Sequence, residues 1–242
     1  MSEGTDNGRM GLVVSDLHLF ARRSAGFGRM QELRPRLKRA SVLVLNGDTF
    51  DFRWSTLPDH PASVERAVEW METLLADLPA CVVHCVLGNH DCLDEFVAEL
   101  DPLVTRRSNF RWHAGSVQIG DAVFLHGDCA NAWMDATVLD RYRASWRCDR
   151  QRHGAATTAY EWLDRLGITR LAHRWQFPLR RTLARVAHHL DHTRPRWRDT
   201  VRRCYFGHTH EPFPEATHEG ITFHNTGSAI SGMVFNPLTF AW

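Results

Sequence analysis

Five short polar turns carry the residues of this chain that could do chemistry. Each turn follows an apolar run typical of a buried strand, and each contains aspartate, asparagine or histidine, which bind divalent cations. Because loops at strand ends collect functional groups in open α/β folds, we expect the five turns to lie close together. In chain order they are Ser15-Asp16-Leu17-His18, Asn46-Gly47-Asp48, Gly88-Asn89-His90-Asp91, His126-Gly127-Asp128 and Gly207-His208-Thr209-His210.

The spacing within these turns favours metal binding. Asp16 and His18 are two residues apart, as are His208 and His210, and in an extended segment this spacing points both side chains the same way. A carboxylate with two oxygens can bridge two ions, and Asp48 is the candidate. Carboxylate with imidazole suits Mn²⁺, Fe or Zn²⁺ rather than Ca²⁺. Each residue alone is more often a cap, turn or surface residue, but the whole set points to a two-metal site.

The elements around the turns predict an α/β fold. Apolar runs at 10–15, 42–46 and 81–87 indicate strands, and amphipathic patterns at 27–37 and 64–78 indicate the helices between them. A short helix at 93–100 is expected to end at Pro102. This alternation is typical of a parallel sheet covered by helices. Further elements are expected as a hairpin at 117–125, helices near 138–146, 160–171 and 178–190, and strands at 203–206, 221–225 and 233–241. Breaks are expected near Gly167 in the second of these helices and at Asn236-Pro237 in the last strand.

The composition indicates one globular domain over 1–242, with residues 130–202 as a helical cap insertion. The chain has 242 residues and 43% hydrophobic content, which suits a sizeable single core. No apolar stretch is long enough for a transmembrane helix, and the polar start lacks a secretory signal. Six scattered cysteines are typical of reduced thiols in a cytoplasmic protein.

The predicted insertion is rich in arginine and aromatic residues. Arginines far outnumber acids between Arg141 and Arg203, although the formal net charge of the chain is only +1. Such a segment suits an amphiphilic anion or a membrane face with anionic lipids, and equally a solvated helix surface with aromatics packed inward. Arg141, Arg143 and Arg147 follow His126 most closely and are the first candidates for contact with a substrate phosphate.

The five motifs, in this order, resemble the calcineurin-like metallophosphoesterase superfamily. The resemblance implies a sandwich of two mixed β-sheets flanked by helices, with two divalent metal ions as cofactors, Mn²⁺ first and Fe or Zn²⁺ next. It also implies a ligand set for each metal. One metal would take Asp16, His18, Asp48 and His210, and the other Asp48, Asn89, His126 and His208.

The same resemblance gives roles to the remaining motif residues. A hydroxide bridging the two metals would attack phosphorus, because coordination brings the pKa of water down to roughly 7. His90 is placed to protonate the leaving oxygen or to hold a phosphate oxygen, and Asp91 would orient His90. Asp128 would either support His126 or serve the turn.

Within the superfamily, the chain most resembles the UDP-2,3-diacylglucosamine hydrolases of lipid A synthesis. The resemblance depends on length, on Ser15–Leu19, on Gly47-Asp48-Thr49-Phe50-Asp51 and on the long insert between His126 and His208. It implies hydrolysis to UMP and a lipid monophosphate in the cytoplasm, with peripheral contact at the inner membrane face. No nucleic-acid partner is expected, because the single insert leaves no separate DNA-capping domain.

His90 departs from that closer pattern. These hydrolases often carry arginine at this position, whereas general phosphodiesterases and phosphatases of the superfamily carry histidine. A general or nucleotide phosphodiesterase is therefore the alternative function, acting on a phosphorylated small molecule. A non-catalytic scaffold on the same fold is a more remote alternative, because such a protein would be expected to have lost ligands and none is missing here.

Overall fold

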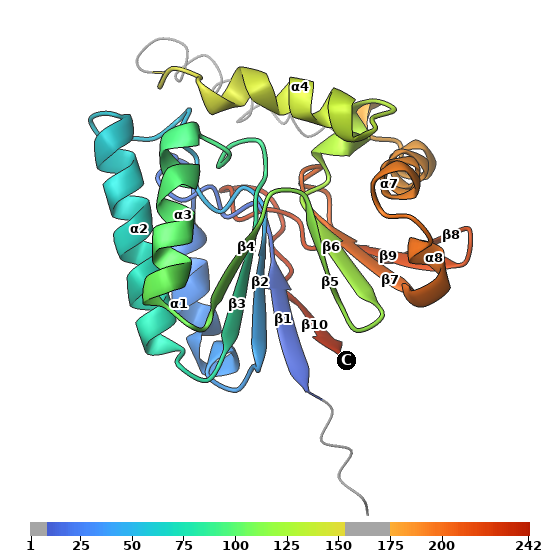
Figure 1. Cartoon of the computed structure of the whole chain (residues 1–242), viewed down its shortest axis with the longest axis horizontal. Helices are drawn as coiled ribbons and strands as arrows, with labels where there is room; N and C mark the ends of the chain where they lie inside the picture. Colours follow the sequence, from blue (N-terminus) through green and yellow to red (C-terminus); the bar gives the residue numbers. More distant parts are fainter. Residues whose placement is uncertain (1–8, 153–174) are drawn as a thin grey trace, which may run out of the picture.

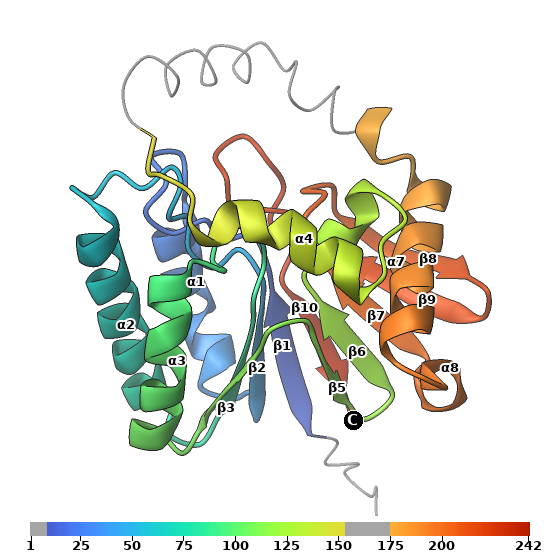
Figure 2. The same ribbon diagram turned by 45° about the horizontal axis from the view of Figure 1, so that its top comes forward.

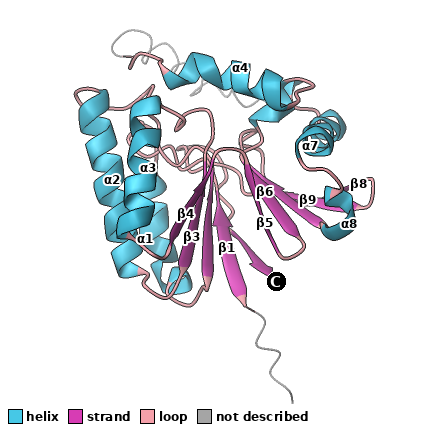
Figure 3. Ribbon diagram, viewed as in Figure 1, coloured by secondary structure: helices cyan, strands magenta, loops and turns pink. Residues whose placement is uncertain are grey.

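Two five-stranded sheets pack face to face between outer helices in the computed structural model, which describes residues 9–152 and 175–242 (Figure 1). The strand order is β10-β1-β2-β3-β4 in the first sheet and β5-β6-β7-β9-β8 in the second. Helices lie on the outer face of each sheet, so the layers run helix, sheet, sheet, helix (Figure 3). The predicted α/β sandwich of two mixed sheets is confirmed.

The first sheet is parallel except at one edge. Strands β1 to β4 run parallel, and β10 pairs antiparallel with β1. Parallel strands need a crossover connection, usually a helix, and the three helices of this half cover the outer face of the sheet (Figure 1). The elements are β1 (Met10–Val14), α1 (Gly26–Leu37), β2 (Val42–Asn46), α2 (His60–Asp77), β3 (Val82–Val86), α3 (Asp94–Arg106), β4 (Phe110–His113) and β10 (Leu238–Ala241).

The second sheet is mixed. Strands β6, β7 and β9 run parallel, while β5 and β8 are antiparallel edge strands. Helix α7 packs its apolar side against this sheet, and α4 crosses above the upper ends of both sheets (Figures 1 and 2). The elements are β5 (Ser116–Ile119), β6 (Ala122–Leu125), η1 (Asp128–Asn131), α4 (Ala136–Arg147), α7 (Leu179–Thr193), α8 (Trp197–Thr200), β7 (Arg203–Phe206), β8 (Phe213–His218) and β9 (Ile221–Asn225).

Side-chain alternation along the strands builds three separate cores. In β1, Val13 points between the sheets while Leu12 and Val14 point toward the helices of the first half. Phe124 of β6 and Tyr205 of β7 stack between the sheets with ring centroids 4.9 Å apart. Because successive strand residues face opposite sides, strands buried on both faces read as continuous apolar runs. This is why β1, β2 and β6 could be predicted from sequence.

The expected end of the third helix is wrong. Helix α3 continues through Pro102 to Arg106, because Leu103 lies in the core beyond the proline and its burial outweighs the cost of the break. Strands β4 and β8 were not predicted, and the last strand begins at Leu238, directly after the predicted break at Asn236-Pro237. The helix expected near 160–171 lies outside the described residues. The inserted cap at 130–202 stays a prediction.

Among the helices that the structure describes, none combines the length and apolar character needed to cross a bilayer.

Candidate metal centre

The five polar turns meet at one end of the sandwich. Three follow β1, β2 and β3 of the first sheet, and two follow β6 and β7 of the second. These strands are parallel within each sheet, so their carboxyl ends collect at the same edge, below α4 (Figure 2). The seven predicted metal ligands therefore come together from segments up to about 190 residues apart, as with Asp16 and His208.

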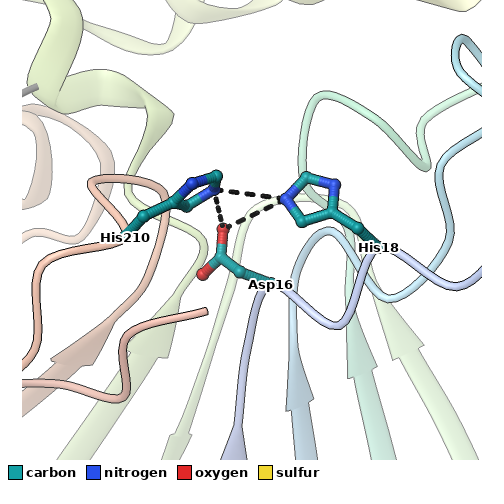
Figure 4. Close-up of side chains that lie close together, drawn as sticks. All are labelled: Asp16, His18 and His210. Atoms are coloured by element: carbon teal, nitrogen blue, oxygen red, sulfur yellow. Dashed lines mark hydrogen bonds and ion pairs between the residues drawn. The ribbon is translucent and has the colours of Figure 1, made fainter. Parts of the chain in front are cut away.

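One group of donor atoms is formed by Asp16, His18 and His210 (Figure 4). The Nε2 atom of His210 lies 3.2 Å from Oδ1 of Asp16 and 3.2 Å from Nε2 of His18. The Nε2 atom of His18 lies 3.9 Å from the same Asp16 oxygen. Two imidazole nitrogens and a carboxylate oxygen thus point at a common centre.

A second group is centred on His126, which is fully buried. Its Nε2 atom lies 3.2 Å from Oδ2 of Asp48, 3.3 Å from Oδ1 of Asn89 and 3.2 Å from Nδ1 of His208. The same Asp48 oxygen lies 3.8 Å from Nε2 of His18 in the first group. Asp48 is therefore the carboxylate that both groups share.

The electrostatics of the second group suit a cation. Burial alone would raise the pKa of the Asp48 carboxyl, but the charges of His126 and His90 outweigh it and hold the pKa well below its usual range. Burial would lower the pKa of His126, yet Asp48, Asp16 and Asp128 raise it to about 10. Three carboxylates therefore place negative charge around His126, whereas burial and the charge of His126 lower the pKa of His208 to about 3.

The glycines of the motifs fit the same centre. A Cβ atom added at Gly88 would lie 2.1 Å from Oδ1 of Asp48, and one at Gly207 would lie 2.1 Å from Oδ2 of Asp16. These contacts are too short for any side chain, so only glycine lets the backbone pass this close to the carboxylates. The motif glycines therefore make room for the ligands.

The backbone at the ligands is strained, as is common at functional sites. Left-handed φ angles occur at five of the seven candidate ligands, namely Asp16, His18, Asp48, His208 and His210. Such angles cost a non-glycine residue about 1 to 3 kcal/mol and persist only where the surroundings impose them. Strained turns, the negative charge around His126 and converging nitrogen and oxygen donors together fit two divalent cations sharing Asp48.

His90 lies beside the ligands and contacts a carboxylate that the motifs did not assign. Its Nδ1 atom lies 3.0 Å from Oδ1 of Asp51, and the other Asp51 oxygen lies 3.2 Å from Nδ1 of His18. Burial would lower the pKa of His90, but Asp51 and Asp48 raise it. Asp51 therefore holds both a metal ligand and the predicted acid in place.

The sequence profile described as calcineurin-like phosphoesterase matches residues 12–212, which include all five motifs. The chain belongs to the calcineurin-like phosphoesterase family. Members use divalent metals, and this chain is accordingly a metal-dependent hydrolase of phosphoric esters or anhydrides with candidate ligands for two ions. Comparison with curated protein sequences gives no significant match.

Solved structures similar to this phosphoesterase include three hydrolases. A dimetal phosphatase from Danio rerio shares 13% identity, with 96% of this chain and 98% of that chain covered and a TM-score of 0.45. A phosphopantetheinyl hydrolase from Mycobacterium tuberculosis shares 11%, with 92% and 90% covered and a TM-score of 0.44. A phosphoesterase from E. coli shares 15%, with 92% and 82% covered and a TM-score of 0.40. These likenesses are too distant to support an argument about substrate.

Asp91 of the phosphoesterase contacts backbone amides of two ligand turns. Its oxygens accept backbone hydrogen bonds from Gly88, at 2.6 Å, and from Thr49, at 2.7 Å. Burial and the Asp48 charge raise its pKa to about 6. The structure thus places Asp91 as a clamp between two ligand turns, and it places Asp51 at His90.

Asp128 and Arg143 form a buried ion pair. The guanidinium donates from Nε to Oδ2 at 2.7 Å and from Nη2 to Oδ1 at 3.0 Å. It also donates to the carbonyls of Leu87 and Ala114. Asp128 therefore contacts Arg143, and the predicted phosphate contact of Arg143 stays a prediction that its present partners do not favour.

The other two predicted arginines, Arg141 and Arg147, also belong to α4. Arg141 is exposed, and Arg147 pairs with Asp140 on the same helix. The pocket beside the metal ligands is lined by two different arginines, Arg22 and Arg23. The sequence did not single out Arg22 and Arg23, because arginines and acids were counted over the long segment 141–203 and the turn after His18 was not considered.

Two residues that contact His90 were given no role at the site from the sequence. Asp51 was quoted within Gly47–Asp51 without a role, although its spacing of three residues from Asp48 was the available signal. Trp146 was expected on a helix and among the aromatic residues of the insertion, but not beside His90, and its ring centroid lies 4.6 Å from that of His90. Arg53 stacks on the Trp146 ring at 3.5 Å, so a layered contact covers His90. No local pattern indicates that α4 would cross above this site.

Proposed function

We propose that this chain hydrolyses a pyrophosphate or phosphodiester bond with two divalent metal ions, Mn²⁺ first among them. The observation that carries the proposal is the convergence of seven ligand-type side chains around Asp48. Asp16, His18, Asp48 and His210 would hold one ion, and Asp48, Asn89, His126 and His208 the other. When bound, the two cations supply an activated water and offset negative charge that develops on the phosphoryl group.

The chain's own residues supply the remaining chemistry. With Nδ1 of His90 against Asp51, its Nε2 atom is the one left to donate a proton to the leaving oxygen. His90 lines the pocket beside the ligands, which supports contact with the substrate. The Trp146 ring against His90 limits the orientations of the imidazole and excludes water from that side. Asp51 orients His90 and stabilises its charged form.

The specific substrate that we propose is UDP-2,3-diacylglucosamine, cleaved to UMP and the lipid monophosphate. It is supported by the motifs Ser15–Leu19 and Gly47–Asp51 and by the arginine- and aromatic-rich stretch between His126 and His208. Exposed Trp133, Trp175 and Leu179 add apolar surface to that stretch. A lipid-linked substrate would require peripheral contact with the inner membrane face from the cytoplasm.

A general or nucleotide phosphodiesterase is the second candidate. The observation that favours it is His90, whose imidazole contacts Asp51 where an arginine would be expected in the lipid A enzymes. Such an enzyme would act on small diesters without an acyl chain.

The deciding experiment is UMP release from UDP-2,3-diacylglucosamine by the purified protein with Mn²⁺. Bis-p-nitrophenyl phosphate is assayed in parallel, and EDTA is the control for each substrate. Chelator-sensitive UMP release would support the lipid A assignment. Hydrolysis of the generic diester alone would keep the metal chemistry and overturn the lipid substrate.

A non-catalytic scaffold would hydrolyse neither substrate, whether or not it binds metal. Asp48→Ala separates these classes, because Asp48 is shared by both donor groups. An enzyme should lose bound metal and turnover together, whereas a scaffold should have no turnover to lose. Metal content by mass spectrometry and turnover of the diester are the two measurements.

A further inference from the structure

The segment 51–54, in the loop after β2, contacts both the ring and the backbone of the predicted proton donor. Oδ1 of Asp51 lies 3.0 Å from Nδ1 of His90, and the amide of Trp54 donates to the same carboxylate oxygen at 2.9 Å. The amide of Phe52 donates to the carbonyl of His90 at 3.4 Å. Consecutive residues of this segment therefore hold the imidazole at one nitrogen and the main chain behind it.

Arg53 belongs to the same segment and reaches the imidazole through an indole. Its Cζ atom lies 3.5 Å from the centroid of the Trp146 ring. The centroid of that ring lies 4.6 Å from the centroid of the His90 imidazole, with 50° between the two planes. Because a planar guanidinium stacks on an indole face, Arg53 restricts the position of the ring that contacts His90.

An ion pair keeps the guanidinium on the indole. Nε of Arg53 donates to Oδ2 of Asp149. Only 17% of the Arg53 side chain and 19% of the Asp149 side chain are exposed, so solvent screens the pair little. Asp149 follows α4, which ends at Arg147 and carries Trp146 in its last turn. The carboxylate and the indole that hold Arg53 thus come from the same end of α4.

Hydrogen bonds fasten this end of α4 to the loop after β2. The amide of Arg152 donates to the carbonyl of Arg53 at 2.8 Å. The side-chain amide of Gln151 donates to the carbonyl of Ser55, also at 2.8 Å. The indole on α4 and the carboxylate in the loop both contact the imidazole, and these bonds fix the two groups relative to each other.

We propose that Arg53 is a positioning residue for the proton donor, acting on His90 through the Trp146 indole. The inference rests on the proposed function, in which His90 gives the proton to the leaving oxygen. Without the guanidinium the indole is free to move and the imidazole loses one of its contacts, and a misplacement near 1 Å costs on the order of 10²-fold in rate. The loss should appear in kcat with KM unchanged, because the proton is needed for bond cleavage and not for binding.

Turnover of two diesters measures this role. Bis-p-nitrophenyl phosphate releases a stable anion, whereas diphenyl phosphate releases a more basic phenolate that depends more on a proton donor. With saturating Mn²⁺, Arg53→Ala should lower kcat about tenfold for diphenyl phosphate and less than about twofold for bis-p-nitrophenyl phosphate. KM and metal content should stay as in wild type.

Two further variants separate the stacking contact from charge and from folding. Arg53→Lys keeps a cation for Asp149 but lacks the planar group, so kcat for diphenyl phosphate should stay at least about fivefold below wild type. This variant also serves if Arg53→Ala folds poorly. The matched control is Arg106→Ala, which removes an arginine paired with Glu72 between two outer helices and should change neither diester.

The double variant Arg53→Ala/His90→Gln tests whether Arg53 acts through His90. If it does, the added Arg53→Ala change should lower kcat less than about twofold below His90→Gln alone, because the donor is already absent. Independent roles would instead multiply the two losses.

Proton NMR of the full chain with Zn²⁺, which is diamagnetic, measures the ring contact without reference to activity. The ring current of the Trp146 indole shifts the Cε1 proton of His90, and loss of a resonance in His90→Gln identifies that proton. We expect Arg53→Ala to move this resonance and Arg106→Ala to leave it in place.

The inference fails if Arg53→Ala lowers kcat equally for both diesters, if its loss multiplies with that of His90→Gln, or if the His90 resonance does not move. Its failure is distinct from failure of the proposed function. A steep leaving-group dependence in His90→Gln with none in Arg53→Ala would overturn only the role of Arg53. A wild type that hydrolyses neither diester would overturn the proposed chemistry, and the NMR comparison would still decide whether Arg53 holds the imidazole.

Discussion

Glycine positions in the motifs decide whether the ligand atoms can approach each other. At Gly207, the space that a Cβ would need is filled by Oδ2 of Asp16 and by Oγ of Ser15, at 2.1 and 2.4 Å. The backbone amide of the next residue, His208, donates to that same Asp16 carboxylate at 3.0 Å. The absence of a Cβ atom at Gly207 is therefore as necessary to the site as the candidate ligands themselves.

Gly207→Ala should therefore disrupt the centre. The added methyl displaces Asp16, and a misplacement near 1 Å costs on the order of 10²-fold in rate. Gly28→Ala on α1 is the matched control, because its Cβ meets nothing within 4 Å, and alanine favours a helix by about 1 kcal/mol. Turnover of bis-p-nitrophenyl phosphate and thermal unfolding measure both. Equal activity of the two variants would contradict the close-approach argument.

His90→Gln tests the assignment of the proton donor. Loss of a general acid costs about 10²- to 10⁴-fold when the leaving group is poor, and much less when it is a stable anion such as p-nitrophenolate. We expect kcat to fall steeply with an alkyl phosphodiester and only slightly with bis-p-nitrophenyl phosphate, with metal content unchanged. A uniform loss across leaving groups would instead indicate that His90 only holds a phosphate oxygen.

Helix α3 shows at the scale of the element how packing overrides a local signal. Pro102 lies inside the helix, where it removes a backbone hydrogen bond, yet Phe96, Leu100 and Leu103 are completely buried on one side of it. Burying such side chains contributes roughly 1.5 to 3 kcal/mol each. The buried side chains on both sides of the proline keep the helix continuous.

Pro102→Ala should stabilise the protein. The site is exposed, alanine restores the missing N–H, and proline costs about 3 kcal/mol in a helix interior, part of which is offset by its stiffening of the unfolded chain. We expect the free energy of unfolding in urea to rise by about 1 to 2 kcal/mol. A decrease would mean that the pyrrolidine ring itself makes a needed contact.

The strand pair β3–β4 carries a histidine pair that makes stability depend on pH. Nδ1 of His84 lies 2.9 Å from Nε2 of His113, and the two rings stack. Burial, His113 and Arg111 lower the pKa of His84 to about 4, and burial and Arg194 lower that of His113. The fold therefore prefers both rings neutral.

Lower folded-state pKa values fix the sign of the effect. The contribution is fully present above the unfolded value near 6.5 and is lost as the pH falls from there toward about 4. With half-buried rings, we expect a loss of about 1 to 2 kcal/mol between pH 7 and pH 5 in urea unfolding. His84→Gln should show a smaller loss over this range. An identical slope in the variant would contradict the assignment.

Across the whole molecule, Arg143 joins parts of the fold that no single element connects. It extends from α4, pairs with Asp128 after β6 of the second sheet, and donates to Leu87 after β3 of the first sheet. Both partners of the ion pair are buried. The same side chain thus fixes α4 above the metal centre and ties the two sheets at the ligand edge.

Arg143→Ala should cost about 3 to 5 kcal/mol, because it leaves a buried Asp128 carboxylate without its partner. Arg147→Ala is the control on the same helix. Its pair with Asp140 is partly exposed and should contribute less than about 1 kcal/mol. Urea unfolding measures both variants. If Arg143→Ala were as stable as wild type but bound phosphate poorly, the original prediction of a phosphate contact would be supported instead.

The sequence by itself predicted an α/β fold, most of its strands and the seven candidate ligand positions. Strands buried on both faces read as apolar runs, and the polar turn after each one is a local feature with its own spacing, as at Asp16 and His18. These patterns are local and can be recognised without knowing the tertiary contacts. The short strand β4 and the continuation of α3 past Pro102 could not be predicted, because both are stabilised by contacts with segments distant in sequence.

Only the tertiary structure decided which carboxylate meets His90 and which arginines line the pocket. Asp91 is adjacent to His90 in sequence, but its oxygens accept hydrogen bonds from the amides of Gly88 and Thr49, and Asp51 is the carboxylate that contacts His90. Arg143 has the charge of a phosphate ligand and is buried against Asp128. Charge and residue type can be read locally, whereas the direction of a side chain depends on the packing of segments distant in sequence.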